Sequence, residues 1–270
     1  MTQTVGVVGA GRMGTPIIGY LAKKGFRTLA YDVNIERRTH VEAMGAKWMP
    51  DLGKLAEESD FILICVGFDR EVRDLLADDG GLCTARAGTV VAIMSTVNPK
   101  TVQQFADARK PSGVHVVDST VCGGGAAADE GTLLSFVGGQ QEVVARLTPV
   151  LQAYSANVVH TGGVGTAQVA KAANNLIMWA CLIANNEALA LARRYGLDIE
   201  TLRKTLLLSS GANKPLEKWG LQTMAWAEDD LVIVQEMAAE CGVSLPQAGL
   251  NREICRALKP PRYKVDQYGI

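Results

Sequence analysis

The sequence lacks an excess of charge of either sign. Lysine and arginine total 27, aspartate and glutamate total 28, and the formal net charge at neutral pH is −1. A surface that binds nucleic acid or docks on an anionic membrane carries a clear basic excess. We therefore expect neither nucleic acid nor a membrane among the partners of this protein.

A long uninterrupted apolar run is also missing. The longest such tract, around residues 176–184, is shorter than the roughly 20 residues that a helix needs to cross a bilayer. The chain opens without a basic segment followed by an apolar one, so we expect no signal peptide. Six scattered cysteines without a C-x-x-C pair indicate reduced thiols, and together these absences predict a cytoplasmic protein.

Histidine is scarce. The three histidines, His40, His115 and His160, lie far apart in the sequence. Metal sites usually draw on histidines and cysteines at short, regular spacings. The sequence therefore predicts no metal.

The 270 residues are 48% hydrophobic and 20% charged, an ordinary balance for a folded chain of one large or two modest domains. Short apolar runs alternate with helical patterns through the first 160 residues, which is typical of βαβ units and a parallel sheet. We expect strands at 5–8, 28–32, 46–49, 61–66, 88–94, 114–118, 133–137 and 157–160. The expected helices are 16–22, 35–44, 51–58, 69–76, 100–108 and 140–151.

The pattern changes near residue 163. Residues 166–195 contain many alanines and no strong helix breaker, which predicts one helix of about 30 residues, roughly 45 Å long. Later helices are expected at 199–208, 215–225, 229–241 and 246–258, with an irregular tail from residue 260. The predicted fold is α/β: a Rossmann-type doubly wound parallel sheet, a long connecting helix and a small all-α domain. We expect residues 1–163 to bind a dinucleotide, and residues 164–270 to contribute substrate and oligomer contacts.

The first expected strand runs directly into a glycine motif, G-x-G-x-x-G. Gly9 would make the tight turn, Gly11 would let a pyrophosphate approach the backbone, and Gly14 would let the following helix pack against the strand. Asp32 ends the next strand, at the spacing of a residue that binds the adenosine ribose. This context predicts a dinucleotide site, with NAD favoured by Asp32 and NADP left as the alternative because two arginines follow, at positions 37 and 38.

One lysine stands out in the long helix. Lys171 lies among alanines, and Asn175 lies one turn further along the same face. Close packing around those alanines would leave the lysine lining a polar cleft, where it can give or take a proton. A lysine that extends to solvent at a domain boundary would show the same pattern, and the residues alone favour neither reading.

A second candidate segment, residues 118–124, follows the carboxyl end of a strand, where ligands bind in open α/β sheets. Its glycines could present backbone N–H groups to an anion such as a carboxylate. A tight turn that needs positive φ explains the same glycines equally well. Cys122 is a poor candidate for a nucleophile, because no nearby histidine is readable in the sequence.

Taken together, these stretches resemble the β-hydroxyacid dehydrogenase family, of the 3-hydroxyisobutyrate dehydrogenase and tartronate semialdehyde reductase type. The resemblance covers nearly the whole chain and rests on four motifs in order. They are G-x-G-x-M-G at 9–14, S-T-x-x-P at 95–99, D-x-x-V-x-G-G at 118–124 and a glycine-rich turn leading to K-x-x-x-N at 162–175.

The resemblance implies hydride transfer between a nicotinamide and a small β-hydroxyacid or its semialdehyde. Lys171 would be the general acid and base, and Asn175 would help to hold the substrate. The implied cofactor residues are Gly9, Gly11, Arg12, Met13, Gly14, Asp32, Val66 and Thr96. The implied substrate residues are Ser119, Cys122, Gly123 and Gly124. Members of the family are commonly dimers or tetramers, so we expect a homodimer or homotetramer.

The chain departs from the family pattern on the substrate side. Thr120 and Cys122 replace a usual proline and serine, Asn213 stands where serine is common, and Asp229 takes the place of a late lysine. The segment 219–229 is also shorter than usual. Two alternatives follow: an imine-reductase-like NADP enzyme, which Lys171 and Asp32 argue against, and a non-catalytic nucleotide-binding member. A 6-phosphogluconate-type enzyme would want a histidine in the K-x-x-x-N segment, and there is none.

Overall fold

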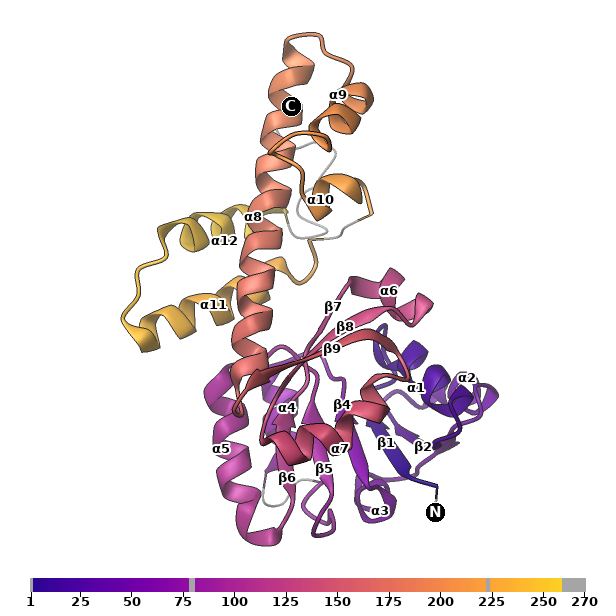
Figure 1. Ribbon diagram of the computed structural model, residues 1–270. Coiled ribbons are helices and arrows are strands. Elements are labelled where there is room, and N and C mark those ends of the chain that lie inside the picture. Colours follow the sequence, from indigo (N-terminus) through magenta and orange to yellow (C-terminus); the bar gives the residue numbers. More distant parts are fainter. Residues whose placement is uncertain (1, 78–80, 222–223, 259–270) are drawn as a thin grey trace. The chain divides into compact units, whose positions relative to one another are not determined.

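The structure is a computed structural model that describes residues 2–77, 81–221 and 224–258 (Figure 1). The chain divides into two compact units, Met1–Lys171 and Ala172–Ile270. The predicted tail from residue 260 lies outside the described residues.

The first unit is built on a nine-stranded sheet. Its strands are β1 (Thr4–Val8), β2 (Arg27–Tyr31), β3 (Lys47–Trp48), β4 (Phe61–Ile64), β5 (Val90–Ile93), β6 (His115–Asp118), β7 (Val121–Cys122), β8 (Leu133–Gly138) and β9 (Ser155–Gly162). The strands β3-β2-β1-β4-β5-β6 lie side by side in this order, and all their pairs are parallel. The chain adds β2 and β3 on one side of β1 and then β4, β5 and β6 on the other side, as in doubly wound dinucleotide-binding folds. The predicted fold class is confirmed.

The far edge of this sheet differs from the all-parallel prediction. β8 runs antiparallel to β6 and β7, whereas β9 pairs with β8 in parallel. The glycine-rich segment after β6 explains the difference, because it carries the chain through β7 and a short helix before β8 returns. The sheet is therefore mixed, with parallel pairs in the majority.

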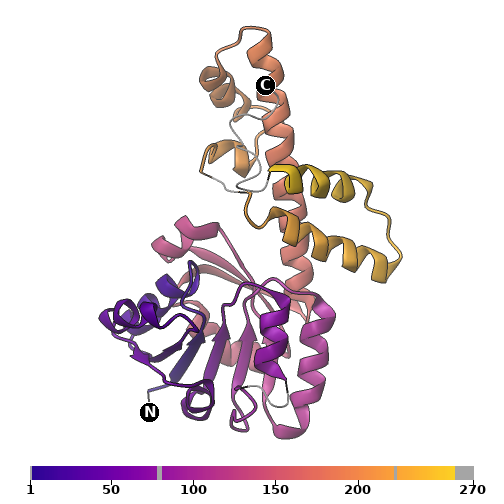
Figure 2. The same ribbon diagram turned by 180° about the vertical axis from the view of Figure 1, so that it is seen from behind.

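Helices cover both faces of the sheet (Figures 1 and 2). They are α1 (Gly14–Lys23), η1 (Ile35–Arg37), α2 (Arg38–Ala43), α3 (Leu52–Glu58), α4 (Asp69–Leu76), α5 (Pro99–Arg109), η2 (Lys110–Ser112), α6 (Gly124–Glu130) and α7 (Gln141–Leu151). Alternate residues of β4 face opposite layers: Phe61 and Leu63 pack with α1 and α7, and Ile62 and Ile64 pack with α3, α4 and α5. A strand covered on both faces must be apolar at every position, which is why β4 and β5 were recognisable in the sequence.

Two helices differ from prediction. The segment 118–124, expected to form a glycine turn or an anion loop, runs into a helix that was not predicted, α6; Gly123, at φ +116°, makes the turn out of β7. The predicted helix 215–225 is the shorter α10 (Lys214–Glu217), and Gly220 follows it with φ +79°. Residues 222 and 223 lie outside the described part of the chain.

The second unit is helical. The long helix α8 (Thr166–Arg194) enters it at Ala172, and α9 (Ile199–Leu206), α10, α11 (Ala227–Cys241) and α12 (Pro246–Leu258) follow. Trp179 and Leu182 of α8 share a buried cluster with Leu231 of α11 and Cys255 of α12. Asn213, noted as a departure from the family pattern, caps α10 through its side chain and exchanges hydrogen bonds with Asn185.

By length and composition alone, α8 is apolar enough to cross a membrane, although the tract 176–184 by itself is too short. Of its most apolar window, 39% is buried within the fold. The core helix of a folded domain passes the same test, and α8 supplies core residues to the second unit. The helix is therefore weak evidence for a membrane span.

Candidate cofactor pocket and active site

The turn between β1 and α1 requires glycine at two positions, Gly9 and Gly14. Gly9 has φ +97°, and a side chain there would start 2.6 Å from the carbonyl oxygen of Cys65. A side chain at Gly14 would start 1.9 Å from the carbonyl oxygen of Gly9. The first turn of α1 thus packs directly on the loop and points its N–H groups at the switch point of the sheet, where anions are favoured.

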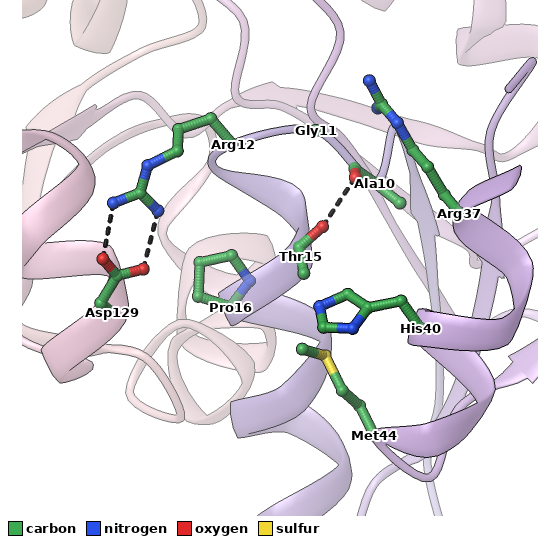
Figure 3. Close-up of a pocket in the computed structure, with 9 residues that line it drawn as sticks. All are labelled: Ala10, Gly11, Arg12, Thr15, Pro16, Arg37, His40, Met44 and Asp129. Carbon is green, nitrogen blue, oxygen red and sulfur yellow. Dashed lines mark hydrogen bonds and ion pairs between the residues drawn. The ribbon is translucent and has the colours of Figure 1, made fainter.

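A pocket of about 450 Å³ opens beside this loop (Figure 3). It is lined by Ala10, Gly11, Arg12, Thr15, Pro16, Arg37, His40, Met44 and Asp129. A side chain added at Gly11 would meet just one atom within 4 Å, Nη1 of Arg37 at 3.4 Å. The bare backbone of Gly11 therefore faces open space bordered by cationic groups, which fits the phosphates of a dinucleotide.

Asp32 directly follows β2, as predicted, but its carboxylate accepts more hydrogen bonds from the protein than the sequence indicated. Its side chain is 6% exposed. Oδ2 accepts hydrogen bonds from the Ala10 amide and from Nη1 of Arg37, both at 2.7 Å. Oδ1 accepts from the Asn34 amide at 2.8 Å. The carboxylate thus organises the glycine loop and is paired with a cation before any ligand arrives.

Arg12, assigned to the cofactor from its place in the motif, points its guanidinium at Asp129 of α6. Nη1 and Nη2 donate to the two carboxylate oxygens at 2.7 and 2.5 Å. This pairing holds the pKa of Asp129 below its usual range. Asp129 and His40, which also lines the pocket, were not in the predicted site; Asp129 carries no local signal, because it lies 117 residues from Arg12.

Three further predicted cofactor residues are half-buried: Met13, Val66 and Thr96. Met13 packs against the core beneath the glycine loop. The carbonyl of Val66 accepts a hydrogen bond from Oγ of Ser95 at 2.8 Å. That bond joins the loops after β4 and β5, so Val66 and Thr96 lie on connected backbone.

Lys171 meets the other glycine-rich segment. Its ammonium donates to the carbonyl oxygen of Val121 at 2.8 Å and lies 3.9 Å from Sγ of Cys122. The side chain is half-buried and does not extend freely into solvent. The ammonium therefore lies beside residues 121 and 122, and the proton-transfer role of the lysine stays a prediction.

A buried aspartate sets the start of the helix that carries Lys171. Asp118 is fully buried, and its two oxygens accept from the backbone amides of Gly165 and Gln168 at 2.8 and 2.9 Å. Burial raises the pKa of this carboxyl, and the two backbone bonds oppose that rise. A carboxylate at a helix N-terminus satisfies orphan N–H groups and complements the helix dipole.

Gln168 fixes the same turn from the other side. It is 1% exposed; Nε2 donates to the carbonyl of Ser95 at 2.8 Å, and Oε1 accepts from the Val97 amide at 3.0 Å. Thr120, which replaces a usual proline, donates to the carbonyl of Ala167 at 3.0 Å. The S-T-x-x-P loop, the D-x-x-V-x-G-G segment and the first turn of α8 are thus joined by hydrogen bonds.

The remaining predicted substrate residues differ in exposure. Gly123 and Gly124 are exposed, and Cys122 is 8% exposed. Ser119 is fully buried, and its hydroxyl has no hydrogen-bond partner in the part of the chain that the structure describes. Asn175 belongs to the second unit, is 2% exposed and accepts from Nδ2 of Asn174.

The late motif also lies in the second unit. Asp229 is half-buried in the first turn of α11, where a negative charge suits the helix dipole. Asp230 accepts a hydrogen bond from Nε1 of Trp179 at 2.9 Å. Among the described residues, no group of three or more histidine, cysteine, aspartate or glutamate side chains is placed to hold a metal ion.

Two family models match consecutive parts of the chain. Residues 4–162 match the NAD-binding domain of 6-phosphogluconate dehydrogenase. Residues 165–267 match the NAD-binding model of NADP-dependent 3-hydroxyisobutyrate dehydrogenase. Together they leave few residues unmatched.

Individual relatives agree with the models. 2-(Hydroxymethyl)glutarate dehydrogenase of Eubacterium barkeri is 30% identical over 93% of this chain and 87% of its own length. A probable mitochondrial 3-hydroxyisobutyrate dehydrogenase of Dictyostelium discoideum is 32% identical over 74% of this chain, a match that spans 63% of that protein.

Among solved structures, 3-hydroxyisobutyrate dehydrogenase of Mycobacterium tuberculosis with L-serine shares the fold at a TM-score of 0.89 and 22% identity. The match covers 99% of this chain and 98% of that one. An imine reductase from Myxococcus stipitatus fits less well, at a TM-score of 0.71 and 18% identity over 95% and 93% of the two chains.

The fold and the two models define an NAD(P)-dependent oxidoreductase with a Rossmann-type domain. The chain belongs to the β-hydroxyacid dehydrogenase family. Its cofactor is NAD or NADP, and the family resemblance read from the four sequence motifs is confirmed.

Proposed function

We propose that this enzyme transfers a hydride between a nicotinamide and a small β-hydroxyacid or its semialdehyde, of the 3-hydroxyisobutyrate or tartronate semialdehyde type. The observation that carries the proposal is the ammonium of Lys171 held beside Val121 and Cys122. The names of the relatives, which include 3-hydroxyisobutyrate and 2-(hydroxymethyl)glutarate dehydrogenases, support the substrate class.

In the proposed site, the loop Gly9–Gly14 holds the pyrophosphate, Asp32 and Arg37 lie at the adenosine end, and Val66 and Thr96 border the cofactor further along. The cofactor, when bound, supplies or accepts the hydride. The protein aligns the reactants and excludes water, which is its usual share of the work in cofactor enzymes.

Lys171 has the proton-transfer role. In reduction its ammonium gives a proton to the carbonyl oxygen of the substrate, and in oxidation the neutral amine takes a proton from the hydroxyl. The positive charge also stabilises the alkoxide that forms between these states. Asp118 and Gln168 do not touch the substrate; they hold the first turn of α8 and so position the lysine.

The substrate carboxylate is proposed to lie at residues 122–124, with help from Ser119. Gly123 and Gly124 are the exposed members of this set. The 8% exposure of Cys122 and the full burial of Ser119 limit how much their side chains can contribute. We therefore expect backbone N–H groups to provide most of the anion contacts.

A direct test follows oxidation of NADH and NADPH with small aldehyde and keto acids. The reverse reaction is followed with 3-hydroxyisobutyrate, L-serine and 2-(hydroxymethyl)glutarate. Turnover of at least one hydroxyacid that Lys171→Ala abolishes supports the proposal. Tight dinucleotide binding without turnover of any of them would favour the non-catalytic alternative, and turnover of cyclic imines would favour an imine reductase.

We further propose that two segments of the chain have different roles. Residues 1–163 bind the dinucleotide, and residues 164–270 contribute substrate and oligomer contacts. The boundary between the two family models, at residues 162 and 165, supports this division. The boundary between the two compact units falls slightly later in the sequence, after Lys171, because residues 166–171 at the start of α8 belong to the first unit.

A homodimer or homotetramer is part of the same proposal. Large apolar side chains are exposed on the helical unit, including Ile177 at 65%, Leu191 at 62% and Leu208 at 90%. Contiguous exposed apolar surface marks an interaction site, and we propose that these side chains belong to one. Sedimentation at micromolar concentration should give a species heavier than the 28.8 kDa chain, and a clean monomer would refute it.

We also propose that the enzyme works in the cytoplasm. Two cysteines, Cys83 and Cys241, are exposed and belong to no disulfide. Exposed thiols persist in reducing compartments. Cell fractionation with a tagged chain tests the location, and recovery in a membrane or secreted fraction would contradict it.

A further inference from the structure

The helix α6 starts directly after Cys122 and Gly123, so its position sets that of the segment 122–124. Gly123 and Gly124 have φ values of +116° and +70°, which glycine adopts readily and residues with a Cβ atom resist. The helix has seven residues, and just Ala127 and Ala128 are buried. So short a helix has little stability of its own, and its placement depends on what holds its far end.

The far end is held from α1 and the loop before it. Both carboxylate oxygens of Asp129 accept from Arg12, and its backbone carbonyl accepts from the Tyr20 hydroxyl at 2.8 Å. Two glycines of this region make room for these side chains. A side chain at Gly125 would start 2.4 Å from Nη2 of Arg12, and one at Gly131 would start 2.6 Å from Cζ of Tyr20.

Arg12 is at the same time part of the glycine loop, and both Arg12 and Asp129 line the cofactor pocket (Figure 3). A guanidinium has five N–H donors, and Asp129 takes two of them, which leaves three. The phosphates of a dinucleotide at this loop would feel repulsion from Asp129 unless the guanidinium neutralised it. One side chain therefore faces two anions, one in the protein and one in the ligand.

We propose that the Arg12–Asp129 pair couples cofactor binding to the position of α6, and through α6 to the substrate segment 122–124. Phosphates that bind beside Arg12 restrict its side chain, and the bidentate bond passes this restriction to Asp129. Arg12 and Asp129 are thus positioning residues. The inference rests on the cofactor pocket and is independent of which acid is the substrate.

Hydrogen exchange measured by mass spectrometry tests the coupling without any substrate. The exchange rate of a peptide that covers residues 121–131 is measured twice, once without cofactor and once with saturating NADH or NADPH. Coupling between sites commonly amounts to about 5- to 150-fold, so cofactor should slow exchange at least ~5-fold in the wild type. In Asp129→Asn, which keeps the shape and removes the charge, the slowing should fall below about 2-fold.

The ratio of the two rates separates coupling from mere stabilisation. A variant that just loosened α6 would exchange faster by the same factor with and without cofactor, leaving the ratio unchanged. Affinity for NADH, from fluorescence titration, should stay within about fivefold of wild type, because the backbone N–H groups of the loop remain. Asp129→Glu, which can rebuild the ion pair, should retain part of the slowing.

Glu130→Gln is the matched control. It removes the same charge from the adjacent position of α6, where the side chain bonds to Thr132 and not to Arg12. This variant should keep the wild-type ratio. The coupling is refuted if Asp129→Asn also keeps that ratio, or if Glu130→Gln loses as much. A wild type that binds no dinucleotide would overturn the cofactor pocket itself, whereas binding without slowed exchange would overturn the coupling alone.

Discussion

Replacing Arg37 by alanine should weaken the binding of NADPH far more than the binding of NADH. Asp32 alone predicts a preference for NAD, because a carboxylate repels a 2′-phosphate. In the structure, however, three of the roughly four acceptor positions of that carboxylate are occupied, one of them by Arg37. We therefore expect the wild type to prefer NAD by no more than about tenfold.

The size of the change follows from two contributions. A hydrogen bond to a charged group contributes about 1.5–3 kcal/mol, and the lower end applies because the Arg37 side chain is 41% exposed and therefore screened. The unpaired Asp32 then repels the phosphate by about 1 kcal/mol at 4 Å in water. The sum of about 2.5 kcal/mol corresponds to a loss of NADPH affinity of about 60-fold. NADH, which has a neutral ribose, should change less than about threefold.

Fluorescence titration of NADH and NADPH measures both dissociation constants and needs no substrate. Arg38→Ala is the matched control, because Arg38 bonds to Glu42 at 2.9 Å and is not among the residues lining the pocket. The loss at Arg37→Ala should shrink as salt is raised from about 50 to about 500 mM. Equal loss of NADH and NADPH, or an equal effect of Arg38→Ala, would refute the reasoning.

Three further predictions concern the helix that carries the lysine. Lys171→Ala should lower kcat at least ~100-fold with NADH affinity unchanged, and Lys171→Arg should not restore it, because arginine keeps its proton; near-normal kcat would make the lysine structural. Gln168→Leu leaves the Ser95 carbonyl and the Val97 amide buried without partners, so thermal or urea unfolding should show a loss of about 2–6 kcal/mol; a loss under ~0.5 kcal/mol would contradict it. Burial raises the pKa of Asp118 above 3.8, so the unfolded chain releases this proton first. The carboxyl's contribution to stability should therefore weaken as pH rises through the interval between the two pKa values. Asp118→Asn should remove that slope from urea unfolding measured over a pH series, and an unchanged slope would assign it to other groups.

Local rules made much of the fold readable in the sequence. β4 and β5 were visible because a strand covered on both faces is apolar at each position. The turn at Gly9 and the close packing at Gly14 depend on steric limits within the glycine loop: Gly9 has φ +97°, and a side chain at Gly14 would start 1.9 Å from the carbonyl oxygen of Gly9. The long helix α8 was predicted to within a residue, because nothing between Thr166 and Arg194 interrupts helical periodicity.

What the sequence could not supply is the partner of each charged group. Lys171 meets Val121 across 50 positions of sequence, and Arg12 meets Asp129 across 117. Arg37 lies just five residues from Asp32, yet their ion pair depends on how η1 turns after β2. Periodicity and glycine sterics act within a few residues and so determined the elements and the nucleotide loop. The groups that hold Asp32, Arg12 and Lys171 in place, two of them charged and one a backbone carbonyl, come from segments that meet when the chain folds, and the tertiary structure alone decided them.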